Sequence, residues 1–439
     1  MPSDAILGAI FDTCYQASLL REEGRLSSFS IIYYSKSTKL VTNRARRAFQ
    51  FTWGMEPIVR FDLERKFSVG EINKLAPVAN AERCMICVGG KSRSRLRIWG
   101  LLDTGDSWRN LALNGVYANS TIRPPPDLTV SSLNSGELIV SSAGEVLLSL
   151  DRGKIIDASG NTLRSKGLSD FFIQARTKLY FAACTPFGQK KYDPEGDDDD
   201  YPNRIYDTCI ARILNGIQDG NHGGTLVVVP DKYYNDDQRL LKRMRIKYPC
   251  TYDHLWKLLV ADLVLKRTHD LFDSSLSKPG NTTTSTQYIM ASEFRRRSEA
   301  NQELIANCCR AISALCNVDG AVVITDRFRV LGFGAEVTVA APKLKSVKIR
   351  RMGSTTPSST SIENYGTRHR SAFRFCSSFK DSIAFVISQD GGIKAVKNCQ
   401  SKVFMWPDVS TLMPMRTFLV GMSDGKLRIF HNGKWQPNS

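Results

Sequence analysis

The stretch Asp319-Gly320-Ala321-Val322-Val323-Ile324-Thr325 decides how the second half of this chain folds. Val322, Val323 and Ile324 form the apolar body of a short run bounded by polar residues, which is typical of a strand buried in a sheet. Asp319 and Gly320 precede that strand. A carboxylate at the end of a buried strand is the kind of ligand that a divalent metal ion takes in proteins. The stretch therefore predicts a central strand with Asp319 as a candidate metal ligand.

A second informative stretch, Gly366-Thr367-Arg368-His369-Arg370, follows further along the chain. It precedes residues 372–376, in which apolar side chains recur at helical spacing, so Thr367 is predicted to cap the amino end of a helix. Arg368, His369 and Arg370 then occupy the first turn. Cations there oppose the helix dipole, whereas a bound anion is favoured by the unpaired backbone N–H groups. The pattern therefore indicates a phosphate site at this helix end.

Together with two further stretches, 223–229 (Gly-Gly-Thr-Leu-Val-Val-Val) and 386–392 (Val-Ile-Ser-Gln-Asp-Gly-Gly), these blocks resemble the diadenylate cyclase (DAC) domain family. The resemblance covers roughly residues 170–425, with a long insertion between the first and second blocks. It implies a bacterial signalling protein with a mixed sheet flanked by helices. Two such domains face each other and condense two ATP molecules into cyclic di-AMP, so a homo-oligomer is expected.

The resemblance also implies the roles of individual residues. Asp319, Arg368, His369 and Arg370 are the expected catalytic residues, and Asp319 and Asp390 are the expected ligands of Mg²⁺ or Mn²⁺. The residues expected to bind the nucleotide are Gly224, Thr225, Leu226, Gly320, Ala321, Gly366, Thr367 and Ser388.

Two departures from the family pattern leave a second function open. Ser388-Gln389-Asp390 stands where the family usually carries Ser-Glu-Glu, and residues 332–336 (Gly-Phe-Gly-Ala-Glu) replace a Leu-Pro-Leu segment. Both departures resemble a divergent branch of the family proposed to act as nucleotide sensors. The alternative to a cyclase is therefore a catalytically inactive protein that binds ATP or a cyclic dinucleotide and signals to a partner.

The length and composition of the chain limit its possible domain organisation and partners. A chain of 439 residues is too long for one compact core, and we expect an N-terminal regulatory domain at 1–165 and a DAC-like domain at 166–439. The formal net charge of +17 indicates an anionic partner. Nucleic acid stays possible but is not favoured, because no groove-reading element is recognised. The sequence shows no signal peptide or membrane span, and its eleven dispersed cysteines fit reduced thiols in a cytoplasmic protein.

The expected fold class is α/β, or α+β over the whole chain. The first domain should contain a helix over residues 6–20 and many short antiparallel strands, at 29–34, 48–53, 83–88, 96–102, 136–141 and 145–150. The insertion at about 231–289 reads as largely helical, and a helix over 292–316 should begin near Arg295-Arg296-Arg297. The basic segment 342–361 resembles a mobile loop. Ligands are expected at the carboxyl ends of the strands.

Overall fold

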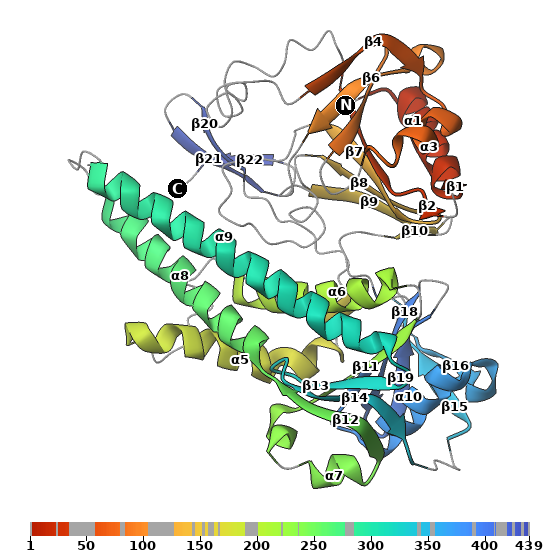
Figure 1. The fold of residues 1–439 in the computed structure, drawn as a ribbon, viewed down its shortest axis with the longest axis vertical. Coiled ribbons are helices and arrows are strands. Elements are labelled where there is room, and N and C mark those ends of the chain that lie inside the picture. The colour runs from red at the N-terminus through yellow and green to blue at the C-terminus, as the bar shows by residue number, and fades with distance from the viewer. Residues whose placement is uncertain are drawn as a thin grey trace. The chain divides into compact units, whose positions relative to one another are not determined.

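A computed structural model gives the fold (Figure 1). It describes residues 2–22, 25–34, 58–79, 84–103, 127–142, 145–151, 154–156, 162–165, 167–188, 201–220, 223–235, 237–276, 285–339, 344–351, 356–388, 392–407, 409, 419–423, 426–431 and 434–437. The chain divides into two compact units, one made of 1–159 with 413–439 and the other of 160–412. The first unit therefore holds both ends of the chain.

The first unit contains an open eight-stranded sheet in the order β10-β9-β8-β7-β3-β5-β6-β4. All neighbours run antiparallel except β3 and β5, which are parallel. The elements are α1 Asp4–Ser18, β1 Arg21–Glu22, β2 Arg25–Leu26, β3 Phe29–Tyr33, β4 Ile58–Lys66, α3 Val69–Leu75, β5 Cys84–Gly89, η1 Arg93–Arg95, β6 Arg97–Asp103, β7 Leu128–Asn134, β8 Glu137–Ser142, β9 Glu145–Asp151 and β10 Lys154–Ile156. A small antiparallel sheet follows near the C-terminus, with β20 Leu419–Ser423, β21 Lys426–His431 and β22 Lys434–Pro437.

One core of this unit lies between α1, α3 and a face of the large sheet. It includes Ile10, Cys14, Phe29, Ile72 and Ile86, none of them more than 1% exposed. The expected helix and the strands near 29–34, 83–88, 96–102, 136–141 and 145–150 are confirmed. The strand expected at 48–53 lies outside the described residues. This unit is an α+β sheet structure with a predominance of antiparallel pairs.

The second unit is built on a nine-stranded mixed sheet in the order β12-β14-β13-β11-β17-β18-β19-β15-β16. Its strands are β11 Gly224–Val229, β12 Met244–Tyr252, β13 Ala321–Thr325, β14 Val330–Val337, β15 Ser346–Ile349, β16 Ser358–Ser361, β17 Ile383–Ile387, β18 Ile393–Cys399 and β19 Lys402–Trp406. The central strands β11, β13 and β17 are buried along their whole length. Continuous apolar runs in these strands therefore reflect burial on both faces.

Helices cover both faces of this sheet (Figure 1). They are α5 Ser169–Cys184, α6 Tyr201–Asp219, α7 Gln238–Leu241, α8 His254–Leu276, α9 Ser285–Ala314 and α10 Thr367–Ser378, with short turns η2 Thr162–Arg164, η3 Thr185–Phe187, η4 Asp231–Tyr234, η5 Leu315–Asn317 and η6 Ile362–Asn364. Helix α10 packs on one face through Ala372, Phe373 and Cys376. Helix α6 contacts β11 and β17, and α9 lies beside α6 and α8. The expected α/β class is confirmed.

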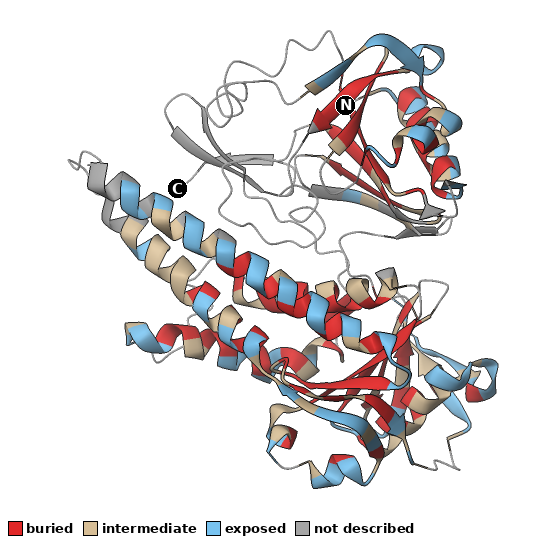
Figure 2. Cartoon of the chain, viewed as in Figure 1, coloured by how far each residue is buried: buried red, intermediate tan, exposed pale blue. Residues whose placement is uncertain are grey.

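The insertion is largely helical, as expected, but residues 244–252 form β12, the antiparallel partner of β14 at the sheet edge. One local expectation is wrong. Segment 342–361 is not a loop throughout, since β15 pairs with β16 and runs parallel to β19. Figure 2 shows the buried central strands in red against the largely exposed β12. Both segments form strands because each pairs with a neighbouring strand. The local sequence does not reveal that partner.

In the part of the chain that the structure describes, no helix is both long enough and apolar enough to cross a membrane.

Candidate functional site

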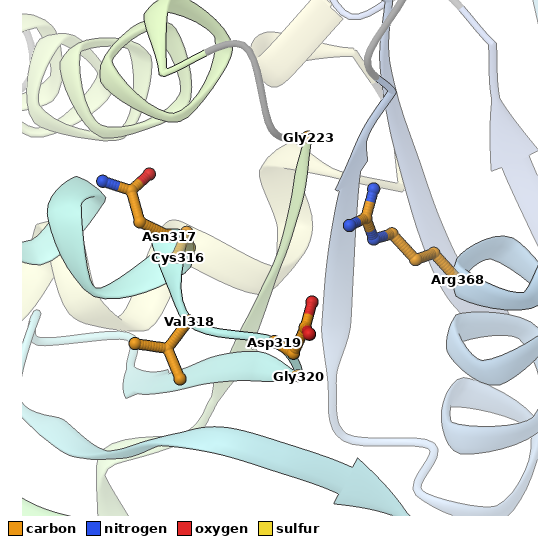
Figure 3. A pocket seen from close by; sticks show the side chains of 7 residues that line it. All are labelled: Gly223, Cys316, Asn317, Val318, Asp319, Gly320 and Arg368. Atoms are coloured by element: carbon orange, nitrogen blue, oxygen red, sulfur yellow. The ribbon is translucent and has the colours of Figure 1, made fainter.

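A polar pocket of about 170 Å³ opens at one edge of the second unit's sheet (Figure 3). It is lined by Gly223, Cys316, Asn317, Val318, Asp319, Gly320 and Arg368. Gly223 precedes β11, and Asp319 and Gly320 precede the parallel strand β13. The pocket therefore lies at the amino ends of these strands, and the expectation of a site at carboxyl ends is wrong. The antiparallel neighbour β17 contributes its carboxyl end, because Ile387 pairs with Gly224.

Asp319 is positioned by the transition from α9 to β13. Helix α9 passes through η5 and enters the sheet at Ala321, which is buried. Between them Gly320 takes a φ of +114°, a conformation that side-chain-bearing residues rarely adopt. A Cβ on Gly320 would lie 2.5 Å from the Gly334 carbonyl carbon. The Asp-Gly-Ala order thus combines a tight backbone crossing with an exposed carboxylate.

Arg368 reaches the pocket from the other side. Figure 3 shows its guanidinium and the Asp319 carboxylate directed into the same space from different elements. The amino end of α10 is capped by Gly366, with φ −67° and ψ 171°, so Thr367 is the first helical residue and not the cap. Arg368, His369 and Arg370 occupy the first turn, as predicted. Among the described residues, neither Asp319 nor Arg368 has an ion-pair partner.

His369 is half-buried behind Arg368. Its ring lies 5.6 Å from the Tyr365 ring and 6.5 Å from the Phe373 ring, measured between centroids. Burial, followed by the positive charges of Lys394 and Arg368, lowers the pKa of His369 to about 4. Its Nε2 atom is buried and has no hydrogen-bond partner within the described residues. The imidazole at pH 7 is therefore neutral and surrounded by cations, an environment that favours an anion.

Arg370 forms an ion pair and does not line the pocket. Its guanidinium donates to the Glu363 carboxylate at 2.9 Å, which joins α10 to the preceding turn η6. Arg368 is therefore the arginine of the pair that lines the pocket. Arg370 supports the helix end from which Arg368 projects.

Comparison with protein families accounts for this arrangement. Residues 216–400 match the DAC family model, described as the nucleotide-binding domain of the DisA bacterial checkpoint controller. Residues 216–400 are a DAC domain. Residues 1–103 match a second family model, described as the probable sensor domain DACNV. No curated protein matches the chain. The resemblance expected from four short blocks is thus shown, and residues 1–103 match a family model that their sequence pattern alone did not suggest.

The other expected nucleotide-binding residues of the DAC domain have varied surroundings. Gly366 and Thr367 are exposed at the start of α10, whereas Leu226 and Ala321 are buried in β11 and β13. Thr225 is 9% exposed. A Cβ on Gly224 would lie 2.7 Å from Ile217 Cγ2 and 3.1 Å from Cys316 Cβ, so this glycine brings β11 close to α6 and η5.

Ser388 and Asp390 follow β17. The Ser388 amide donates to the Gly392 carbonyl at 3.0 Å, and Asp390 lies outside the described residues. Strand β11 lies between β13, which follows Asp319, and β17, which precedes Asp390. The proximity of Asp319 and Asp390 therefore stays a prediction.

Sequence reasoning missed three residues of the site. Gly223, with a φ of +61°, lines the pocket, whereas the family resemblance had implied its neighbour Gly224. Asn317 is an exposed lining residue. Lys394 lies on β18, opposite Val386, and its charge acts on His369. Nothing local marks Lys394, because only the β17–β18 pairing brings it beside α10.

The donor chemistry of the DAC pocket fits a divalent metal ion held jointly with a nucleotide. Mg²⁺ is usually bound through one or two carboxylates together with substrate phosphates. Asp319 supplies one exposed carboxylate. No group of three acidic, histidine or cysteine side chains suited to a metal is found in the described residues. The described residues therefore do not form a metal site made of protein ligands alone.

Arg295, Arg296 and Arg297 do not form an anion site at a helix start. Helix α9 begins at Ser285, so these arginines lie well inside it. Arg296 and Arg297 both donate to the Glu293 carboxylate, at 2.9 and 2.7 Å. The two guanidinium groups lower the pKa of Glu293 to about 2 through these hydrogen bonds. The observed partner of Arg296 and Arg297 is therefore an acidic side chain of the same helix.

Proposed function

We propose that the DAC domain of this chain binds ATP in the pocket beside Asp319 and Arg368 and joins two ATP molecules into cyclic di-AMP. The observation that carries the proposal is the convergence of a carboxylate and a guanidinium, far apart in the sequence, on one polar pocket. The match of residues 216–400 to a nucleotide-binding family supports the same ligand class.

In this reaction the 3′-hydroxyl oxygen of one ATP attacks the α-phosphorus of the other. The bond from that phosphorus to the bridging oxygen breaks, pyrophosphate leaves, and the hydroxyl proton is lost. A second equivalent step closes the ring. The chemistry depends mainly on positioning and on neutralising charge. Because each hydroxyl must meet a phosphorus from another bound ATP, two domains must face each other, and we expect a homodimer.

The residues of the pocket suit these steps. Arg368 would bind phosphate oxygens and stabilise the departing pyrophosphate, since arginine matches phosphate geometry with paired donors. Asp319 would lie on the side of the site that holds the ribose 3′-hydroxyl. Together with the phosphates, it would bind Mg²⁺ or Mn²⁺. Such an ion, when bound, supplies positive charge to the hydroxyl and phosphate oxygens. Lys394 and the neutral His369 would line the phosphate end.

The test is incubation of the purified full-length protein with ATP and either Mg²⁺ or Mn²⁺, with products identified by mass spectrometry. Wild type should form cyclic di-AMP. Asp319→Asn and Arg368→Ala should each reduce the rate by about 10²-fold or more, the effect of losing one group that stabilises transition-state charge. Asp381→Asn, an exposed aspartate paired with Lys232, and Arg374→Ala, further along α10, are the matched controls.

A sensor without turnover is the second candidate. Ser388-Gln389-Asp390 departs from the family's acidic pattern, and residues 1–103 match a family described as a probable sensor domain. This candidate predicts ATP or cyclic di-AMP binding that Arg368→Ala weakens, with no product under either metal at any protein concentration. Product formation by wild type that Asp319→Asn abolishes would decide against it.

We place either activity in the cytoplasm. All eleven cysteines are unpaired thiols, as expected where disulfides are kept reduced. ATP is the substrate of the first candidate and one of the two ligands open to the second. Steep salt dependence of DNA or RNA binding would be the sign of the third, disfavoured partner class suggested by the charge of +17.

A further inference from the structure

Residues 89–97 of the first unit form a basic turn that links β5 to β6. Its sequence is Gly-Gly-Lys-Ser-Arg-Ser-Arg-Leu-Arg. The turn follows the carboxyl end of β5, which runs parallel to its neighbour β3. Glycine, lysine and serine are the residue types that hold phosphates in nucleotide-binding loops. The composition of the turn therefore suits an anionic ligand.

Five cations gather at the basic turn without an acidic partner. They are Lys66, Lys91, Arg93, Arg95 and Arg97. Lys66 on β4 belongs to this set because it is the direct cross-strand neighbour of Arg97 on β6. Like charges directly opposite each other on two strands repel. Among the described residues none of the five forms an ion pair, and Arg97 donates to the backbone carbonyl oxygens of Ser94 and Leu96, at 3.2 and 2.9 Å. The turn therefore holds positive charge that the described chain does not neutralise.

The backbone of the basic turn is held in one shape. The Tyr33 hydroxyl, at the end of β3, donates to the Gly90 carbonyl at 2.6 Å, and the Arg95 amide donates to the Ser92 carbonyl at 3.0 Å. A Cβ on Gly90 would lie 2.8 Å from the Arg95 carbonyl carbon, so the two sides of the turn touch. Leu96 is 3% exposed and belongs to the core of this unit. A ligand therefore does not have to order the turn, which lowers the cost of binding.

The charged side chains themselves are open to a ligand. Lys91, Arg93 and Arg95 are exposed, and so is Lys66 on β4, a strand that is exposed along most of its length (Figure 2). The hydroxyl oxygens of Ser92 and Ser94 lie 3.4 Å apart within the same turn. Serine hydroxyls, like arginine and lysine, donate hydrogen bonds to phosphate oxygens. Cations and hydroxyl donors are thus presented together.

The number and kind of donors indicate the class of ligand. A phosphate monoester carries roughly 1.5–2 negative charges at pH 7, so one such group does not match five cations, whereas about three linked phosphates do. Residues 90–97 include no aromatic side chain on which the bases of a nucleic acid would stack. Residues 90–95 include no apolar side chain that would insert into a membrane. The turn therefore favours a short, soluble chain of phosphates.

We propose that the basic turn, together with Lys66, is a binding site for a ligand recognised through several linked phosphates, whether these are free or carried by a nucleoside. Arginine binds phosphate oxygens through paired donors, and the lysine ammonium groups and serine hydroxyls add further donors. The site lies within residues 1–103, which match a family described as a probable sensor domain. It shares no residue with the pocket of the DAC domain, so it does not depend on the proposed function.

The first test titrates tripolyphosphate into the full-length protein by calorimetry at low salt, where charged contacts are least screened. The protein carries Arg368→Ala, so that a phosphate donor of the pocket is removed. Adding Arg93→Gln and Arg95→Gln together should weaken tripolyphosphate binding by about 10-fold or more, because two charge-assisted contacts are lost. Lys257→Gln with Arg296→Gln is the matched control. It removes the same charge from exposed positions elsewhere and should change the affinity by less than about twofold.

Two further ligands define what the turn recognises. CTP should bind with an affinity close to that of tripolyphosphate, since the phosphates and not the base are contacted. Orthophosphate should bind more weakly, because it meets fewer cations. If CTP binds through the turn but tripolyphosphate does not, recognition depends on the nucleoside and the inference is overturned.

Chemical labelling locates the site independently in the wild-type protein. Saturating tripolyphosphate, without metal ion, should protect Lys66 and Lys91 from acetylation by an N-hydroxysuccinimide ester, as read by mass spectrometry. Lys257, exposed in the second unit, should react as before. Unprotected Lys66 and Lys91 would overturn the inference, and so would an equal loss of affinity in the matched control. Binding of duplex DNA or anionic vesicles through the turn, without binding of tripolyphosphate, would assign the surface to a macromolecule instead.

Discussion

The pKa of His369 reflects the burial of its ring and the charges around it. It lies between aromatic rings and beside Lys394 and Arg368, and it has no acid to stabilise its protonated form among its described contacts. Burial lowers its pKa first, and the two cations lower it further, to about 4. The site therefore keeps a neutral imidazole at pH 7, which leaves room for the negative charge of a ligand.

This environment predicts a pH dependence of stability. An unfolded histidine binds a proton as the pH falls below about 6.5, whereas folded His369 resists protonation until about pH 4. Acidification through this window therefore favours the unfolded chain, and stability rises with pH across it. His369→Gln should lose less stability than wild type between pH 7 and pH 4.5, by on the order of 1 kcal/mol after allowance for partial exposure.

Urea unfolding followed by circular dichroism at several pH values measures the difference. Above pH 7.5 the imidazole is neutral in both states, so the gap between wild type and variant should no longer change with pH. Equal acid sensitivity of the two proteins would contradict the assignment.

Gly320 carries a second prediction at this scale. An alanine at 320 would need a φ of +114° and would place its Cβ 2.5 Å from backbone of β14. Gly320→Ala should therefore lower the free energy of unfolding by about 2–4 kcal/mol, from strain and overlap together. Gly366→Ala is the control, because its φ is −67° and nothing lies within 4 Å of the added Cβ. Urea unfolding of both variants is the measurement, and a similar loss in both would argue against the backbone crossing.

Elements differ in how far the sequence predicts them. Strands β11, β13 and β17 are continuous apolar runs, and α10 has a clear helical spacing, so local pattern identifies them. Strand β12 contains Pro249 and alternating charged residues, and it exists because glycine-rich β14 offers a close partner. The glycines at 332 and 334 allow tight backbone packing against β12. The sequence of β14 alone does not show which strand packs against these glycines.

The residues of the site also differ in how far the sequence predicts them. Asp319 and Arg368 were identifiable because an acid at a strand end and a cation at a helix start are unusual where they stand. The exact helix cap was not, since Gly366 and Thr367 differ by one residue and only the backbone angles decide between them. Lys394 comes beside His369 through sheet register, which no short motif records.

Helices α6, α8 and α9 are joined by a buried polar cluster that carries a prediction at the element scale. The Asp262 carboxylate on α8 accepts from Tyr201 Oη on α6 at 2.6 Å and from Asn301 Nδ2 on α9 at 3.1 Å, and Asp262 is 1% exposed. Removing it leaves both donors without this acceptor. Asp262→Ala should therefore destabilise the protein by about 2–4 kcal/mol.

Asp270→Ala, on the same helix but in an exposed pair with Lys266, should change stability by less than about 1 kcal/mol. Chemical denaturation compares the two variants. A small effect of Asp262→Ala would mean that the helices are held by apolar contacts alone.

At the scale of the whole molecule, the pocket lies entirely within one unit. Each lining residue falls between 223 and 368, inside the unit 160–412, while the match to DACNV covers 1–103 of the other unit. The expected domains, a regulatory domain at 1–165 and a DAC-like domain at 166–439, stay a prediction. The pocket and the residues that match a family described as a probable sensor therefore fall in different units.

A fragment of residues 160–412 should therefore fold alone and bind ATP within about threefold of the full-length affinity, because no lining residue comes from the other unit. Calorimetry with ATP measures the affinity, and Arg368→Ala in the same fragment shows whether the binding uses the pocket. A fragment that folds by circular dichroism but does not bind ATP would mean that the first unit completes the site. If binding is retained but the rate of product formation differs from that of the full chain, the first unit controls turnover rather than affinity, which is the role expected of a regulatory domain.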